Sequence, residues 1–242
     1  MEYEDILAAL NVKQLNKLKD SNLRFSEILG LEIPFYDGFG FPPALMPIAN
    51  SIGSFQYFGA FLYDIVDSKV SFVDLMVDDS ELFEIGLNEK QFCYYLARRS
   101  LHDYLEEDPD ISSEIYQLCS LLGVDEFNSL QTIDEQNYLR LDVFRSGVPK
   151  YLQNRQGGTT HGKTGFDLAS NGMQLNFDLS ASFSDAISNS DYQLAWEVLN
   201  SPGWLLEDAK SAFKKLVDHT GNQLLSGLYS KWASLNHPQQ GY

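Results

Sequence analysis

Residues 55–77 read FQYFGAFLYDIVDSKVSFVDLMV, and this stretch decides the fold class. Aromatic and β-branched residues are concentrated in 55–63 and again in 70–77. These residue types favour the pleated surface of a sheet, and the polar residues 67–69 between them are typical of a turn. We therefore predict two antiparallel strands joined by a turn, with a third strand at 82–85.

Helical patterns lie on both sides of these strands. Apolar residues in 4–29 recur at the spacing of two short helices, and Gly30 ends the second. After the third strand, Asn88 is followed three residues later by Gln91, which resembles a capping box. The pattern predicts a helix that begins there and reaches about Leu105.

Four prolines lie between the N-terminal helices and the strand pair, at positions 34, 42, 43 and 47. Proline lacks a backbone N–H and fixes φ, so it disrupts a regular helix or a central strand. We therefore expect residues 31–48 to form an ordered, packed loop.

The second half of the chain begins with an acidic break at 106–110, where Pro109 ends any preceding helix. A helix at 113–122 follows and stops at Gly123. Residues 139–143 alternate between apolar and charged side chains, but a helix fits this window equally well, so both alternatives stay open.

Asn171 and Gly172 separate two short runs, 166–168 and 173–179, in which apolar and polar residues alternate. This dipeptide suits the positive φ angles of a tight turn. We therefore predict a β-hairpin near 165–180.

Three helices complete the chain, at about 191–199, 204–218 and 223–235. We expect the three tryptophans of this region to share one core: Trp196, Trp204 and Trp232. Together the patterns predict an α+β fold in two domains. Residues 1–106 would hold N-terminal helices and a small antiparallel sheet, and 111–242 a mostly helical region with the hairpin.

The net charge of −17 and the pI near 4.4 disfavour direct nucleic-acid binding, because phosphate contacts need cationic groups. From Ser100 to Leu139 the chain has ten carboxylates and no Lys or Arg. A solvated acidic face and a surface that steers a basic partner both fit this pattern. The partner-binding hypothesis centres on these residues: Asp103, Glu106, Glu107, Asp108, Asp110 and Glu114.

The N-terminal residues are acidic where a signal peptide would be basic, and no apolar run approaches the roughly 18 residues of a membrane span. The two cysteines, Cys93 and Cys119, lie in segments with the periodicity of amphipathic helices. We therefore expect a cytoplasmic protein with two free, buried thiols and no membrane partner.

Residues 157–164, GGTTHGKT, match the phosphate-loop pattern of Gly, four residues and then Gly-Lys-Thr. A phosphate loop needs a buried strand before it and a helix after it, whereas polar residues precede this segment and the predicted hairpin follows it. A glycine- and threonine-rich surface loop is the better interpretation. A nucleotide-binding enzyme that uses 157–164 is the alternative.

No other pattern indicates catalysis. The four histidines are widely separated, neither cysteine has the sequence setting of a nucleophile, and the carboxylates are too numerous to single out a catalytic pair. We therefore predict no catalytic, cofactor-binding or metal-binding residues and expect that the protein is not an enzyme.

A family resemblance lies around the strand pair. Residues 41–50, FPPALMPIAN, are followed by Gly53 and then by 57–64, YFGAFLYD, while 82–88, LFEIGLN, lead towards Phe92. This series resembles the SUKH superfamily (Smi/Knr-type), in which a proline and an apolar pair lead through a glycine turn to an aromatic strand that ends in Asp.

The resemblance covers about residues 31–105, under half of the chain. It implies an immunity protein of bacterial competition, which binds and neutralises a cognate toxin. Many such toxins are nucleases with basic clefts, and an acidic surface can occupy such a cleft. A non-catalytic regulatory or scaffold protein that binds a cellular partner is the alternative from another class.

Overall fold

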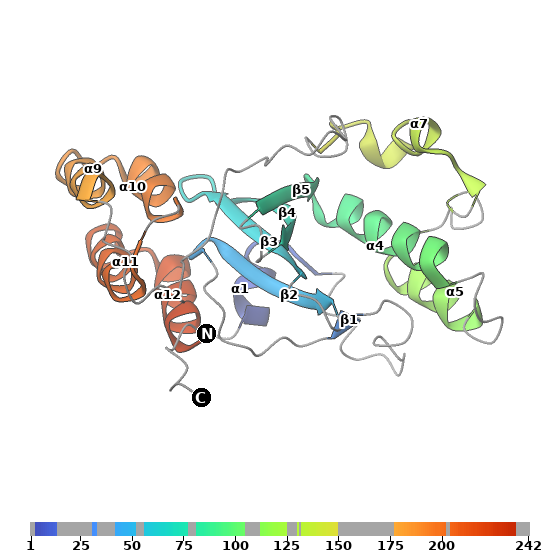
Figure 1. Ribbon diagram of the computed structural model, residues 1–242, viewed down its shortest axis with the longest axis horizontal. Coiled ribbons are helices and arrows are strands. Elements are labelled where there is room, and N and C mark those ends of the chain that lie inside the picture. Colours follow the sequence, from blue (N-terminus) through green and yellow to red (C-terminus); the bar gives the residue numbers. More distant parts are fainter. Residues whose placement is uncertain are drawn as a thin grey trace.

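A computed structural model gives the architecture of the protein (Figure 1). It describes residues 3–13, 31–32, 42–51, 56–76, 81–104, 112–124, 130, 132–149, 177–201 and 204–235. Within these ranges, helices lie at both ends of a central antiparallel sheet (Figure 1). The predicted α+β fold class is therefore confirmed.

The sheet has five strands in the order β1-β2-β3-β4-β5, each antiparallel to its neighbours. The strands are β1 (Leu31–Glu32), β2 (Leu45–Ser51), β3 (Gln56–Asp64), β4 (Lys69–Met76) and β5 (Glu81–Gly86). β3 and β4 confirm the predicted strand pair, and β5 confirms the third strand. The chain turns between β3 and β4 at residues 65–68, where Ser68 adopts a φ of 54°.

The prediction of a loop at 31–48 is wrong at the two ends of that segment. β1 covers its first two residues, and β2 runs through Pro47. The sheet accommodates this proline because the register of β2 against β3 shifts between Pro47 and Ala49. On its other side β2 pairs with β1 farther along, at Asn50 and Ser51. The proline thus lies at an irregularity in the ladder, where a missing N–H is tolerated.

β3, the middle strand of the sheet, is buried along most of its length. Tyr57 and Phe58 point to opposite faces of the sheet, and both are buried. A Cβ atom at Gly59 would stand 2.4 Å from the carbonyl oxygen of Met46 on β2. The close approach of these two strands therefore requires glycine at this position.

α4 (Glu89–Tyr104) packs on one face of the sheet. The ring of Phe92 stacks on Phe72 of β4 with centroids 4.9 Å apart. One and a half to two turns later along α4, the guanidinium of Arg99 lies over the ring of Phe58 on β3. These contacts hold α4 along the two central strands.

The predicted start of α4 is confirmed. The backbone N–H of Gln91 donates to the Asn88 side chain at 3.0 Å. The Gln91 side chain accepts from the Leu87 backbone N–H and donates to the carbonyl oxygens of Val143 and Gly147. Gln91, predicted as the second residue of a capping box, therefore also links α4 to residues 143–147, more than fifty positions away.

Among the described residues of the first part of the chain there are also four shorter helical elements. They are α1 (Tyr3–Ala9), α5 (Ser112–Leu121), α7 (Glu135–Tyr138) and the 3₁₀ helix η1 (Asp142–Phe144). α5 confirms the helix predicted at 113–122, and it ends at Gly123, whose φ is 68°. η1 places helical structure in the window 139–143, and the rest of the predicted N-terminal helices, 14–30, lies outside the described residues.

Both cysteines are buried on neighbouring helices, Cys93 on α4 and Cys119 on α5. Burial raises the pKa of the Cys119 thiol to about 12, so this side chain packs as a neutral, apolar group. In the part of the chain that the structure describes, no helix has the length and apolar character to cross a membrane.

The C-terminal helices are α9 (Phe177–Ser188), α10 (Tyr192–Leu199), α11 (Leu206–Thr220) and α12 (Gln223–Leu235). The last three confirm the predicted helices. The three tryptophans are buried in the core, as expected, and Trp196 and Trp232 both pack on Phe213 of α11.

The predicted hairpin near 165–180 is wrong at its C-terminal end. Residues 177–179, assigned to its second strand, form the first turn of α9, and 165–176 lie outside the described residues. Leu179 begins a helical series with Phe183 and Ile187, at intervals of four, which a short alternating window does not reveal.

One face of α10 docks at one end of the sheet, where β3 ends and β2 begins. The Trp196 indole N–H donates to the carbonyl oxygen of Leu62 on β3 at 2.7 Å. The side-chain oxygen of Asn200 accepts from the Ala44 backbone N–H at 2.7 Å. These bonds join the two regions predicted as domains, while the predicted boundary at 106–111 lies outside the described residues and stays a prediction.

Candidate interaction surface

The structure describes only part of the acidic stretch predicted to bind a partner. Asp103 lies in the last turn of α4, and Glu114 is half-buried in the first turn of α5, a helix that packs on α4. Residues 106–110, which include the other four predicted carboxylates, lie outside the described residues. The predicted surface therefore stays a prediction.

Another candidate surface emerges from the apolar side chains that the fold leaves in solvent. Among the described residues, three large apolar side chains are exposed: Tyr63 at 39%, Val66 at 73% and Leu194 at 44%. Two belong to the end of β3 and the turn after it, and the third belongs to α10. We define the turn–helix surface as residues 63–69 together with the exposed side chains of α10 and its N-cap.

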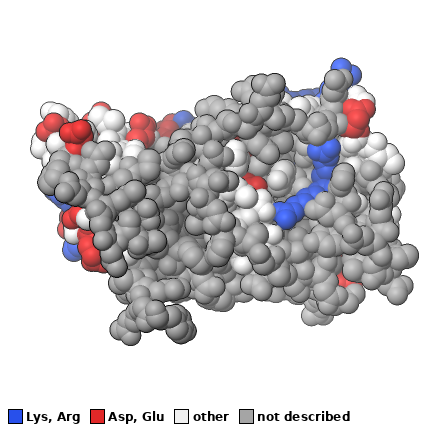
Figure 2. Space-filling view, viewed as in Figure 1, with Lys and Arg blue, Asp and Glu red and all other residues white. Residues whose placement is uncertain are grey.

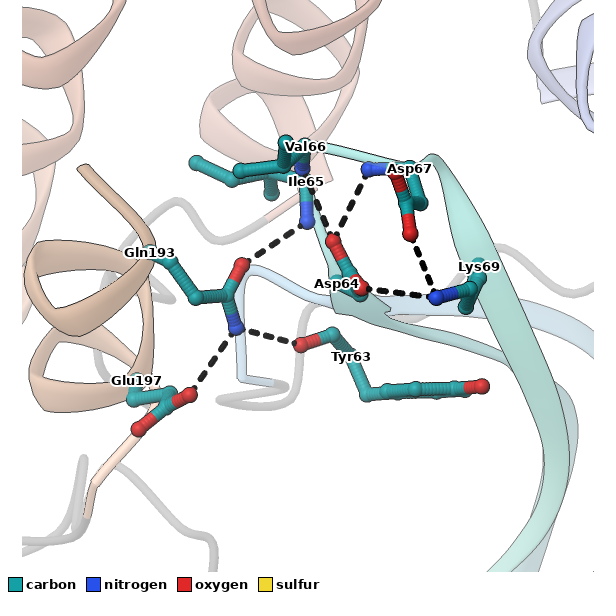
Figure 3. A network of polar contacts seen from close by, with 8 residues as sticks. All are labelled: Tyr63, Asp64, Ile65, Val66, Asp67, Lys69, Gln193 and Glu197. Atoms are coloured by element: carbon teal, nitrogen blue, oxygen red, sulfur yellow. Dashed lines mark hydrogen bonds and ion pairs between the residues drawn. The ribbon is translucent and has the colours of Figure 1, made fainter.

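Hydrogen bonds that the Asp64 carboxylate accepts fix the shape of the turn (Figure 3). Its Oδ1 accepts from the backbone N–H groups of Val66 and Asp67, both at 2.9 Å. The bond from Asp67 is the largest influence on the pKa of Asp64, which lies below its ordinary value. Lys69 donates to the carboxylates of Asp64 and Asp67 and closes the turn from the other side.

Gln193 joins α10 to this turn through both polar atoms of its side-chain amide (Figure 3). Its Oε1 accepts from the Ile65 backbone N–H at 3.0 Å, and its Nε2 donates to the Tyr63 carbonyl oxygen at 2.9 Å. The same Nε2 also donates to Glu197 at 2.9 Å. With Trp196 and Asn200, Gln193 forms a row at i, i+3 and i+7, so these bonds to the turn and the sheet come from one face of α10 and its C-cap.

The helices α9 and α10 carry exposed carboxylates. Residues 177–201 contain Asp178, Asp185, Asp191 and Glu197 and no Lys or Arg, and all four carboxylates are exposed. Asp191 also caps α10, because its side chain accepts from the Leu194 backbone N–H. Figure 2 shows Asp and Glu side chains gathered at the end of the molecule where Figure 1 has α9, α10 and α11.

The geometry of the turn–helix surface suits protein binding. Its apolar side chains stand on a turn and a helix that many hydrogen bonds hold in place, so little conformational entropy remains to be lost on binding. Its carboxylates repel phosphate and attract cationic groups. Apolar contact area inside a charged rim is the usual composition of a protein–protein interface.

A buried carboxyl group lies between the sheet and α4. Asp74 of β4 is only 6% exposed, and its Oδ2 accepts from Gln56 of β3 at 2.7 Å. Its Oδ1 has no hydrogen-bond partner among the described residues. Burial raises the pKa of Asp74 to about 6, against the opposing effects of Gln56 and the nearby Arg99.

The sequence also singled out the glycine-rich segment and the histidines as candidates for a site. The glycine-rich segment 157–164 lies outside the described residues. His219 is exposed on α11, where its Nδ1 contacts the Lys215 carbonyl oxygen. Within the described ranges, no group of three or more His, Cys, Asp or Glu side chains could hold a metal ion.

The sequence interpretation missed the turn–helix surface, although it contained two weak signals. Tyr192, Ala195, Trp196 and Leu199 are spaced as the buried face of a helix, and Leu194 falls outside that series. Val66 is an apolar residue inside a short polar turn. The contact between turn and helix joins positions about 130 residues apart, which no local pattern reveals.

Comparisons of this chain with protein-family models, with curated proteins and with solved structures found no match.

Proposed function

We propose that this chain is an immunity protein that binds a basic bacterial toxin in the cytoplasm and neutralises it. The observation that carries the proposal is the turn–helix surface, where Val66 and Leu194 are exposed among carboxylates on two hydrogen-bonded elements. An exposed apolar side chain that is held in place is a candidate anchor for a partner protein.

Charge favours a basic protein as that partner. The net charge of −17 attracts cationic proteins over a distance and raises their association rate. A nuclease toxin fits this requirement, because its substrate cleft is built to bind phosphate. The exposed carboxylates at the turn–helix surface would then occupy positions that phosphates take in the substrate complex.

The resemblance of residues 31–105 to the SUKH superfamily gives the proposal its biological role. In this proposal residues 1–106 form a SUKH-like domain and 111–242 a helical domain that adds the α10 half of the surface. The packing of Phe92 on Phe72 is consistent with the family pattern of a Phe-bearing helix after the last strand. The acidic residues from Asp103 to Glu114 would steer the toxin without forming the main contact.

Co-expression with the reading frame directly upstream of this gene tests the function. We expect the upstream product to arrest growth when it is expressed alone, and this chain to restore growth and to co-elute with it. A chain that carries Gln193→Ala serves as a sensitive variant, because it frees the turn from α10 while leaving the buried core in place.

Two outcomes would contradict the proposal. One is an upstream product that arrests growth whether or not this chain is present. The other is a growth defect on deletion of this chain in cells that lack the upstream product, because an immunity protein is dispensable without its toxin. The second outcome would favour the scaffold alternative.

A further inference from the structure

The β3–β4 turn already carries a cation on its carboxylates. Lys69 Nζ lies 3.4 Å from Asp64 Oδ2 and bonds to Asp67 Oδ2 at closer range. The hydrogen bond that Lys69 donates to Asp67 is also the largest influence on the pKa of Lys69, which is raised. The turn is therefore a place where a carboxylate binds an ammonium group in the folded protein.

Asp64 and Asp67 have different roles in the turn. Asp64 accepts from two backbone N–H groups of the turn and is mostly covered. Breaking these hydrogen bonds would loosen the turn. Asp67 is 59% exposed, and among the described residues Lys69 is the only cation bonded to it. Asp67 can therefore exchange one cation for another while the backbone of the turn stays in place.

We infer that a partner's Arg or Lys takes over Asp67 from Lys69, and that the docking segment is basic and amphipathic. Exposed ion pairs such as Lys69–Asp67 are weak, so exchange costs little. An incoming arginine would bind the carboxylate with two parallel hydrogen bonds, which a lysine cannot do. The apolar side of the same segment would pack on Val66, which precedes Asp67 in the turn, and on Leu194 of α10, whose neighbour Gln193 bonds to the turn.

This inference rests on the proposed function for its partner, but its test does not use the toxin. The probe is a synthetic amphipathic peptide with leucine on one face and arginine on the other. Its Kd for the full chain is measured by calorimetry at low ionic strength, where surface charges are least screened. The peptide assay and the growth assay can therefore fail independently.

Lys69→Gln frees Asp67, and Lys214→Gln is the matched control. Lys214 also pairs with a carboxylate, Asp218, in a similarly exposed ion pair on α11, outside the residues that define the turn–helix surface. Both variants change the net charge equally. We expect Lys69→Gln to tighten peptide binding by about twofold to fivefold relative to Lys214→Gln, which is the range expected for release of an exposed ion pair.

A third variant assigns the effect to one carboxylate. Asp67→Asn in the Lys69→Gln background is expected to remove the gain, since the released carboxylate is then absent. Equal Kd values for Lys69→Gln and Lys214→Gln would overturn the inference. A double variant that kept the gain would overturn it as well, because the peptide would then engage a group other than Asp67.

Discussion

Asp74 shows how a single buried carboxyl sets a pH dependence. The folded protein raises its pKa from 3.8 to about 6, chiefly because burial disfavours the charged form. Between these values the folded state keeps a proton that the unfolded chain loses. The contribution of Asp74 to the free energy of unfolding is therefore largest at low pH and is lost as pH rises from about 4 to about 6.

Asp74→Asn is expected to remove this dependence, because the amide keeps the shape and carries no charge. Relative to the wild type, the variant should gain about 2 to 3 kcal/mol of unfolding free energy between pH 4 and pH 7, which is most of the shift converted at about 1.4 kcal/mol per pH unit. Urea denaturation of both proteins at several pH values measures it. A stability difference that stays constant across this range would show that Asp74 does not titrate in it.

At the scale of elements, local patterns predicted β3, β4, β5, α4, α5 and the last three helices. These elements depend on residue types and caps that lie within their own sequences, such as Asn88 before α4 and Gly123 after α5. β2 was missed because its proline is tolerated only through a bulge formed with β3. α9 was missed because its first residues alternate like a strand.

Gly59→Ala tests the close approach of β2 and β3. The added methyl group would meet the Met46 carbonyl oxygen and force the two strands apart, at a cost of about 2 to 3 kcal/mol. Gly221→Ala is the control, since its Cβ meets no atom within 4 Å and only its φ of 59° is unfavourable, at about 1 kcal/mol. Equal urea midpoints for the two variants would show that the strand contact does not restrict position 59.

At the scale of the whole molecule, the described elements that carry the two candidate surfaces lie in two separate regions. The α9–α10 end and the α4–α5 end lie on opposite sides of the sheet (Figure 1). The second region was visible in the sequence as a run of carboxylates without Lys or Arg. The first was not, because the β3–β4 turn and α10 come together only when Gln193 and Trp196 reach the end of β3.

These two regions have different expected roles in toxin binding. Lysine at positions 106, 107, 108 and 110 should slow association at low salt and leave dissociation nearly unchanged, because charge steering acts mainly on the association rate. The effect should weaken at physiological salt, where charges are screened beyond about 8 Å. Side chains that form the contact itself should act mainly on dissociation.

The dissociation rate of the double variant Val66→Ser, Leu194→Ser from the upstream-encoded toxin tests the central claim most directly. Both side chains are exposed, so the variant should retain its stability within about 0.5 kcal/mol per site, which thermal unfolding checks. We predict that it dissociates at least about tenfold faster than the wild type, as expected for the loss of apolar anchors worth more than about 1 kcal/mol each. A dissociation rate equal to that of the wild type would contradict the assignment of the turn–helix surface as the binding site.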